Sequence, residues 1–379
     1  MFAYQKNNRY FAQIAEGLED LGGEELAALG AREVKPVFRG IYFGADRAAL
    51  YRINYCSRLC TRILAPLLRF SCHSDKYLYR TARELHWEEV LPPGATFAAA
   101  ATVSHSRLRH SQYAALRLKD AVVDRLRELR GKRPDIDRRQ PDLWLNLHIE
   151  NNIATIAVDT SGGSLHRRGY RLQSLTAPMQ ETLAAAIIRL SGWEGERPLV
   201  DPMCGAGTLL AEAYMHFCRI PAGYLRKRYG CERLPDFDPA LWQRVKKEAE
   251  QAFRVSPVGL IAGSDMASEA VAAARANLAV LPSGDRVRLA VRRFEQLEGI
   301  ENAVIVSNPP YGLRLKQGEE MAVFMRGLGD FLKRRCTGST AYLYLGRREL
   351  VKSVGLRPAW KKPLKNGGLN GLLVKYELY

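Results

Sequence analysis

Short apolar strands alternate with helical stretches from residue 197 to residue 347, the pattern of a parallel sheet covered by helices. Parallel strands need long crossover connections, so this alternation restricts the second half of the chain to the α/β class. A late strand over Leu372–Leu378 is expected to pair antiparallel. The expected parallel strands are Leu199–Asp201, Val258–Ser264, Arg286–Ala290, Ala303–Ser307 and Ala341–Leu345.

A glycine turn follows the first of these strands. The stretch PLVDPMCGAGTLLAEA (198–213) ends a strand at Asp201, turns through Gly205 and Gly207, and begins a helix near Thr208. Glycines let the backbone approach a ligand closely, and a helix start offers free N–H groups. The turn lacks both the third glycine of a dinucleotide fingerprint and the Lys-Ser/Thr pair of a P-loop. A cofactor with a positive amine suits Asp201 better than a polyphosphate.

The second parallel strand ends in Gly263–Asp265. An acid at this position commonly binds ribose hydroxyls in such folds. The alternative is a helix cap before Ser268. The long gap after the glycine turn predicts an insertion over Ile220–Ser256, with a helix over Pro239–Phe253.

A second loop, Ser307-Asn308-Pro309-Pro310-Tyr311-Gly312, follows a buried strand. The two prolines fix the backbone and leave the Pro309 carbonyl free to accept a hydrogen bond. The Asn308 side-chain oxygen is a second acceptor, and Tyr311 offers a ring for stacking. Two acceptors that take both hydrogens of an exocyclic base amine direct its lone pair at an electrophilic methyl group. The alternative is an ordinary strand-ending turn.

The first 160 residues are expected to form two small α+β units. The first holds a strand over Phe11–Ile14, a helix over Gly17–Leu29, one extended stretch over Val34–Phe43 and a helix over Ala48–Leu59. The second holds a strand over Arg62–Phe70, a helix over Lys76–Val90, a strand over Thr96–Val103, a helix capped by Ser111 that runs to Arg130, and a hairpin of Leu143–Ile149 and Ile153–Val158. A polar linker or ordered loop and a helix over Met179–Leu190 follow.

The charge is strongly positive, with 57 Lys and Arg against 40 Asp and Glu. Residues 52–139 hold 18 basic and 9 acidic side chains, and residues 326–379 hold 12 and 3. Two such regions, rich in arginine, indicate a nucleic-acid partner. The alternative is a solvated surface in an arginine-rich proteome.

The cysteines and the hydropathy argue against export. Seven cysteines at irregular spacing suit a reducing cytosol, and Cys56, Cys60 and Cys72 are expected to be buried thiols instead of metal ligands. No apolar run is long enough to span a bilayer, and Met1–Tyr10 has no signal-peptide core. We expect a cytoplasmic protein with no membrane contact, no metal and no obligate protein partner.

Taken together, these motifs resemble a known family. DPMCGAGT (201–208), GSD (263–265) and NPPYG (308–312) are similar to the S-adenosylmethionine-dependent amino-methyltransferases of nucleic acids. RHSQYAALRLKDAVVDRLR (109–127) and the hairpin 143–158 resemble the end of a THUMP RNA-binding domain. Three further segments resemble the bacterial 23S rRNA guanine-N2 methyltransferases: residues 159–171, 177–193 and 232–242.

The resemblance implies a class I methyltransferase domain over 197–379, after a ferredoxin-like unit (1–60), a THUMP domain (61–160) and a linker with a leading helix (161–196). It implies methyl transfer from S-adenosylmethionine to guanine N2 of large-subunit rRNA. The catalytic residues would be Asn308, Pro309, Pro310 and Tyr311. The cofactor would be bound by Asp201, Pro202, Cys204, Gly205, Gly207, Thr208, Asp265, Met266 and Phe294. RNA would be bound by Arg107, Arg109, Gln112, Lys119, Arg167 and Arg168.

One position departs from the family pattern. The acid that often bonds the adenine amine after the third strand is replaced by the run Val291-Arg292-Arg293-Phe294-Glu295, so either Glu295 takes over or Phe294 stacks on the adenine. Three other functions stay open: guanine-N2 methylation of tRNA, adenine-N6 methylation, and an RNA-binding ribosome-assembly role with dispensable methylation. A nicotinamide-dependent dehydrogenase is a weak further alternative.

Overall fold

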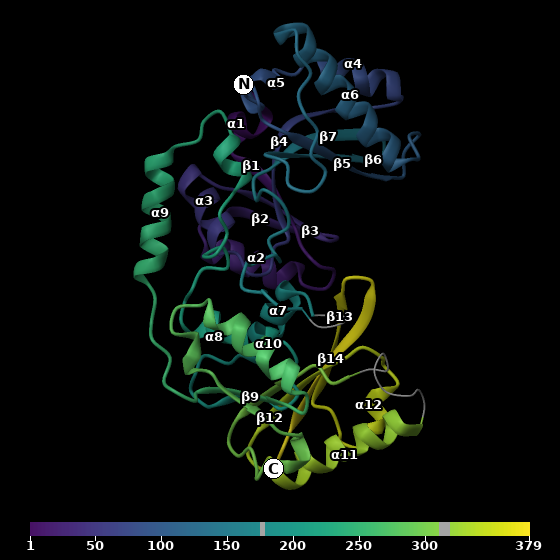
Figure 1. Cartoon of the computed structure of the whole chain (residues 1–379). Coiled ribbons are helices and arrows are strands. Elements are labelled where there is room, and N and C mark those ends of the chain that lie inside the picture. Colours follow the sequence, from purple (N-terminus) through teal and green to yellow (C-terminus); the bar gives the residue numbers. More distant parts are fainter. Residues whose placement is uncertain (175–178, 311–318) are drawn as a thin grey trace. The chain divides into compact units, whose positions relative to one another are not determined.

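The computed structural model describes residues 1–174, 179–310 and 319–379 (Figure 1). The chain forms two compact units, and each contains one seven-stranded sheet. The first unit comprises Met1–Ile14, Glu19–Leu165 and Arg226–Lys247, and the second comprises Ala15–Leu18, His166–Leu225 and Glu248–Tyr379. The predicted α/β fold class with α+β units at the N-terminus is confirmed. The four domain boundaries stay a prediction.

One continuous sheet organises the first unit, in the order β2-β3-β1-β4-β7-β6-β5. Only β5 and β6 are parallel neighbours. The stretch expected to be extended over Val34–Phe43 is a hairpin of two strands, because the chain turns at Phe38 and Arg39. The strands are β1 (Arg9–Gln13), β2 (Arg32–Val37), β3 (Gly40–Gly44), β4 (Arg62–Ser71), β5 (Phe97–Ser104), β6 (Leu143–Glu150) and β7 (Ile153–Asp159).

Helices pack on this sheet in two groups, α2 against β2 and β3, and α6 against β5 and α4. The prediction of a single helix over Lys76–Val90 is wrong. The first helix, α4, ends at Arg83, and α5 is a separate helical turn. Ser111 is the first residue of α6 and does not cap it. The helices are α1 (Ala3–Asn7), α2 (Glu19–Ala28), α3 (Arg47–Cys56), α4 (Asp75–Arg83), α5 (Trp87–Val90) and α6 (Ser111–Arg130).

The predicted insertion exists, and most of it belongs to the first unit. Residues 226–247 carry the turn η1 (Gly230–Arg233) and most of α9 (Pro239–Gln251). The Trp242 ring packs edge-on against Tyr51 and Tyr55 of α3, at centroid distances of 5.5 and 5.8 Å. The Asp236 carboxylate accepts a hydrogen bond from Tyr4 Oη at 2.6 Å. The insertion therefore completes the core of the first unit.

The sheet of the second unit has the order β10-β9-β8-β11-β12-β14-β13. The first five strands are parallel, and β14 pairs antiparallel with β12 as expected. The edge strand β13 was not anticipated. The strands are β8 (Leu199–Asp201), β9 (Ile261–Asp265), β10 (Arg288–Val291), β11 (Val304–Ser307), β12 (Thr340–Leu345), β13 (Trp360–Asn366) and β14 (Leu369–Glu377).

Apolar helix faces cover this sheet and form its core. Met325, Leu328 and Leu332 of α11 are fully buried against β11, β12 and β14. The described helices and helical turns are α7 (Glu181–Ser191), α8 (Thr208–Phe217), α10 (Ser268–Ala279), η2 (Gly284–Arg286), η3 (Phe294–Gln296), α11 (Glu319–Arg335) and α12 (Leu350–Ser353). Because β8, β9 and β11 are parallel neighbours, the loops after them meet at one edge of the sheet.

Candidate functional site

The glycine turn after β8 has the backbone geometry that its sequence predicts. Gly205 and Gly207 have φ of +53° and +76°, in the left-handed region that side chains rarely adopt. A Cβ on Gly207 would lie 3.0 Å from the Ala274 Cβ of α10. The turn therefore needs glycine both for its conformation and for its close approach to α10.

Asp265, at the end of β9, holds this turn in place. Its Oδ2 accepts a hydrogen bond from the Gly205 N–H at 2.9 Å, and its Oδ1 accepts one from the Ala267 N–H at 3.0 Å. Ala267 is the N-cap of α10, so the alternative role of Asp265 as the cap residue is wrong. The predicted contact of Asp265 with ribose stays a prediction.

A buried hydrogen bond joins the two motif loops. Ser307 Oγ donates to Asp201 Oδ1 at 2.8 Å, and the Met203 N–H donates to the same oxygen at 3.1 Å. Both Asp201 and Ser307 are 1% exposed. The pKa of Asp201 is raised to about 7, chiefly by burial and in smaller part by the Asp265 charge, although the two hydrogen bonds lower it. Asp201 therefore connects the glycine turn to the Asn-Pro-Pro loop and holds a titratable proton between them.

Asn308 is an unsatisfied acceptor in the second loop. Its Oδ1 is buried and has no hydrogen-bond partner among the residues that the structure describes. A buried amide oxygen without a partner costs about 1–3 kcal/mol, which indicates that a ligand group completes it. Pro309 is buried and Pro310 half-buried beside it, whereas Tyr311 lies outside the described residues.

The other predicted cofactor residues fall into two groups. Pro202, Cys204 and Thr208 are buried within the turn, and burial raises the pKa of the Cys204 thiol. Met266 is 65% exposed just after β9. Val291, which lies opposite Asp265 at the end of β10, is 54% exposed.

Phe294 has a packing role in this structure. It is 4% exposed, and its ring packs edge-on against Phe324 and Phe331 at centroid distances of 5.6 and 5.5 Å. Its stacking on adenine stays a prediction without an open ring face to support it.

Arg171 was missed by the sequence analysis. Its Nη2 donates to Met179 O at 2.7 Å and to Thr208 Oγ1 at 3.2 Å, and its Nε donates to Glu181 Oε1 at 2.9 Å. Its Nη1 is buried and has no partner in the described part of the chain. A guanidinium with an unused donor beside the start of α8 is placed to meet an anionic ligand group.

Asn277 of α10 was also missed. Its Oδ1 accepts from the Leu172 and Gln173 N–H groups, and its Nδ2 donates to the carbonyls of Gln173 and Ala206. The segment expected to be a linker or loop is thus ordered against the glycine turn. A lone amide among the alanines of α10 is the one sequence signal that could have found it.

The predicted RNA-binding residues are only partly placed to bind. Arg107, Arg109 and Gln112 are exposed around the start of α6, and Arg167 is exposed. Lys119 Nζ pairs with Asp120 Oδ1 at 2.6 Å. RNA contacts of these five residues stay a prediction.

Arg168 is wrong as an RNA-binding residue. It is 1% exposed, and its Nε pairs with Glu212 Oε1 of α8 at 3.3 Å. The same oxygen accepts a hydrogen bond from Tyr170 Oη at 3.1 Å. Its role is to anchor the segment before α7 to the core, because a buried charge must be paired.

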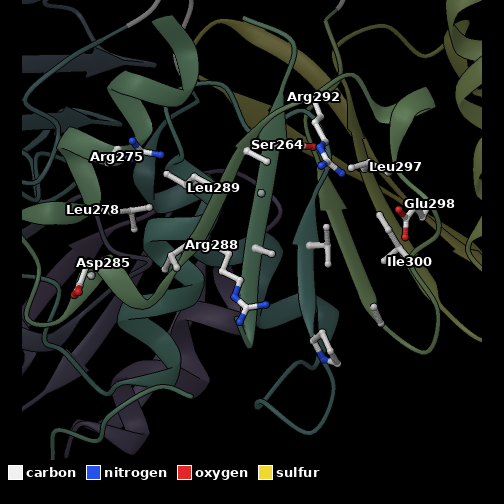
Figure 2. A pocket seen from close by; sticks show the side chains of 18 of the residues that line it. Ser264, Arg275, Leu278, Asp285, Arg288, Leu289, Arg292, Leu297, Glu298 and Ile300 are labelled. Atoms are coloured by element: carbon white, nitrogen blue, oxygen red, sulfur yellow. The ribbon is translucent and has the colours of Figure 1, made fainter. Parts of the chain in front are cut away.

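A hollow of about 1000 Å³ lies over the face of β8, β9 and β10 (Figure 2). It exists because the connection from β10 to β11 contains only the turn η3, so no helix fills the space. Arg288 of β10 and Arg292, the residue after this strand, project along it, and Arg275 and Leu278 of α10 line one side. Its lining includes none of the predicted catalytic or cofactor residues.

Residues 1–174, 179–310 and 319–379 contain no group of three or more His, Cys, Asp or Glu side chains with the arrangement to hold a metal ion. None of the described helices has the length and apolarity that crossing a bilayer requires.

Family models match most of the chain. An RMKL-like methyltransferase domain matches residues 168–375, a THUMP domain matches 72–159, and an RlmL ferredoxin-like domain matches 9–64.

Curated relatives agree with these matches. A candidate RNA methyltransferase of Synechocystis sp. is 39% identical over 98% of this chain and 97% of the relative. The ribosomal RNA large subunit methyltransferase K/L of Syntrophotalea carbinolica is 37% identical over 98% of this chain. This chain spans 53% of that relative's length.

Solved structures share the whole architecture. The protein SMU.472, described as a candidate methyltransferase complexed with S-adenosylhomocysteine (SAH), superposes with a TM-score of 0.86 at 28% identity, over 98% of both chains. The chain therefore belongs to the RMKL-like family of S-adenosylmethionine-dependent methyltransferases, with THUMP and RlmL ferredoxin-like domains ahead of the catalytic domain.

Proposed function

We propose that the protein transfers one methyl group from S-adenosylmethionine to the exocyclic N2 amine of a guanosine in large-subunit rRNA. The observation that carries the proposal is the buried Asn308 Oδ1, which lacks a hydrogen-bond partner within residues 1–174, 179–310 and 319–379. Its loop is connected to the glycine turn through Ser307 and Asp201. An orphan acceptor at this place fits an N–H donor of the substrate.

The residues of the second loop do the positioning. The lone pair of the guanine amine is delocalised into the ring, so the amine is a poor nucleophile. Asn308 Oδ1 and the Pro309 carbonyl would accept its two hydrogens and turn the lone pair away from the ring plane. The bound cofactor supplies an electrophilic methyl group on a sulfonium. Positioning of the two reactants supplies much of the rate enhancement. As the N–C bond forms, the methyl–sulfur bond would break with its electron pair passing to sulfur, and the surplus amine proton would pass to solvent.

The described residues fit this cofactor. Gly205 and Gly207 leave the backbone open, with φ values of +53° and +76°, and α8 begins directly after them. The free Nη1 of Arg171 beside Thr208 suits the carboxylate of the methionine moiety. Met266 suits the adenine face. Each of these contacts is part of the proposal.

The RNA substrate is supported by the THUMP match and by the charge. Residues 52–139 and 326–379 each carry an excess of basic side chains, and phosphates recruit such surfaces. Guanine N2 of rRNA is favoured by the K/L relatives of Syntrophotalea carbinolica and Photobacterium profundum, at 37% and 36% identity. The cytoplasm is the proposed site of action, with no membrane, metal or obligate protein partner.

Adenine N6 is the second candidate. A solved relative from Listeria monocytogenes, 28% identical with a TM-score of 0.86, is described as a predicted N6-adenine-specific DNA methylase. The Asn308 acceptor accommodates either amine, so the loop does not separate the two bases.

A single assay separates these candidates. The purified chain is incubated with labelled S-adenosylmethionine and, separately, with 23S rRNA from a strain lacking this protein, with tRNA and with DNA. Nucleosides are then identified by mass spectrometry. We expect N2-methylguanosine in 23S rRNA with the wild type and none with Asn308→Ala. Label confined to tRNA, to DNA or to N6-methyladenosine refutes the proposal, and so does equal formation of N2-methylguanosine by Asn308→Ala.

A further inference from the structure

An open face of the first sheet carries features that the catalytic site does not use. In β1, Tyr10 and Ala12 point into the core, whereas Arg9, Phe11 and Gln13 alternate onto the opposite face. The helix α2 packs against β2 and β3 on the core side, where a Cβ on Gly23 would meet Val34 and Pro36 at 3.3 and 3.5 Å. The face of Phe11 therefore lacks this helix cover.

Two aromatic rings stand side by side in the centre of this face. Phe11 lies directly opposite Tyr42 of β3, with ring centroids 4.9 Å apart and the planes inclined by 58°. Tyr42 is 53% exposed. The Phe11 ring lies over Gly40, where a Cβ would come within 2.0 Å of it. Gly40 thus allows the Phe11 ring to lie down on the sheet beside Tyr42.

Basic side chains border the two rings. Lys35 of the edge strand β2 lies opposite Tyr42, which extends the aromatic row to the sheet edge. In the neighbouring row, Arg32 and Arg9 lie opposite Gly44 from its two sides. All three basic residues are exposed, and Glu33 pairs with Arg9 at 2.6 Å. The acidic residues Glu19 and Asp20 begin helix α2, which packs on the opposite face of the sheet. The three basic residues therefore lie on the face away from these two carboxylates.

We propose that Phe11 and Tyr42 form a stacking platform for unpaired RNA nucleobases, with Lys35, Arg32 and Arg9 binding the phosphates. A sheet surface with exposed aromatics binds single-stranded RNA because every base has a π-face, while the bases of a duplex are already stacked. An RNA strand that runs from the Tyr42 ring to the edge of the sheet would place a phosphate next to Lys35. This platform rests on the proposed function and extends it, because it would bind unpaired nucleotides of the substrate RNA other than the methylated one.

Fluorescence anisotropy of the full-length protein tests the platform without any methyl transfer. The probes are a labelled unstructured RNA octamer of A and U and a blunt RNA duplex of equal length. Tyr42→Ala removes the ring, Tyr42→Phe retains it, and Tyr42→Leu keeps apolar area without a π-face. Val258→Ala is the control, since Val258 is an exposed apolar side chain at 59% in the second unit and lies outside both basic regions.

Loss of one stacking ring lowers affinity by about tenfold. We expect that loss for the octamer with Tyr42→Ala and Tyr42→Leu, and a change under about twofold with Tyr42→Phe, Val258→Ala and every duplex measurement. Octamer affinity within twofold of wild type for Tyr42→Ala overturns the platform, as does equal loss for octamer and duplex. A changed sedimentation coefficient with unchanged octamer affinity identifies the face as a protein contact and also overturns it. These outcomes are independent of which base is methylated.

Discussion

The buried carboxyl of Asp201 should make the stability of this protein depend on pH in an unusual direction. Its pKa is raised to about 7 by burial in the folded chain, whereas an unfolded aspartate titrates near 3.9. Between these values the folded chain holds a proton that the unfolded chain has released. The stability contributed by this proton is therefore full below about pH 4 and is lost as the pH rises through 7.

The size of the effect follows from the two pKa values. Between about pH 4 and pH 7, each pH unit lowers the free energy of unfolding by about 1.36 kcal/mol. The wild type should therefore lose about 2.5 kcal/mol of stability from this group between pH 5 and pH 8. For a unit of about 200 residues, this loss corresponds to about 5–10 °C in Tm. Asp201→Asn keeps an acceptor oxygen for Ser307 Oγ and the Met203 N–H but has no proton to release. We expect the variant to lose this part of the pH dependence.

Differential scanning calorimetry at pH 5, 6, 7 and 8 and constant ionic strength measures the slope of Tm against pH. The matched control is Asp265→Asn, which removes a carboxylate from the same loops, one that is half-buried and bonded to backbone N–H groups. Titrations elsewhere in the chain are common to all three proteins and cancel. An identical slope in wild type and Asp201→Asn, or a slope lost equally in Asp265→Asn, refutes the reasoning.

Three other predictions follow from contacts described above. Arg168→Met breaks the buried pair with Glu212 and should lower the free energy of unfolding by about 3–5 kcal/mol in urea titrations, with unchanged RNA affinity; weaker RNA binding by the folded variant would contradict the assignment. Gly207→Ala forces a side chain into φ of +76° and should weaken SAH binding about 5- to 30-fold by calorimetry, while an unchanged Kd would show that the turn adapts. The double variant Arg107→Glu and Arg109→Glu should weaken RNA binding and reduce the dependence of RNA affinity on salt concentration, with SAH affinity intact. An unchanged salt dependence would show that neither residue binds RNA phosphates.

The strands of the second unit were easier to predict from the sequence than those of the first, because local sequence patterns mark where most of them lie. Short runs of three to six residues separated by helices identify β8, β11 and β12 within a residue or two. The missed strand β13 carries Lys361, Lys362 and Lys365 around Pro363, a composition that reads as loop. Only its pairing with β14 at the sheet edge makes it a strand, because an edge tolerates lysine and proline.

Burial of charge was the least predictable property. Arg167 and Arg168 are adjacent in a polar, glycine-rich segment, yet one is exposed and the other fully buried. The difference is made by Glu212, which lies 44 residues further along the chain. No local pattern contains that partner. The same holds for Arg171 and Asn277, whose hydrogen bonds connect segments that only the fold brings together.

The insertion has a consequence for the order in which the chain can mature on the ribosome. Residues 226–247 supply Asp236 and Trp242 to the unit that begins at Met1, so that unit is incomplete until residue 247 has left the exit tunnel. By then, β8 and the glycine turn of the second unit have already emerged. An N-terminal fragment ending at Leu165 should therefore expose Tyr4, Tyr51 and Tyr55 and require a chaperone. The first unit, which contains the THUMP domain, therefore cannot complete its fold until a segment that follows the glycine turn in the sequence has been translated.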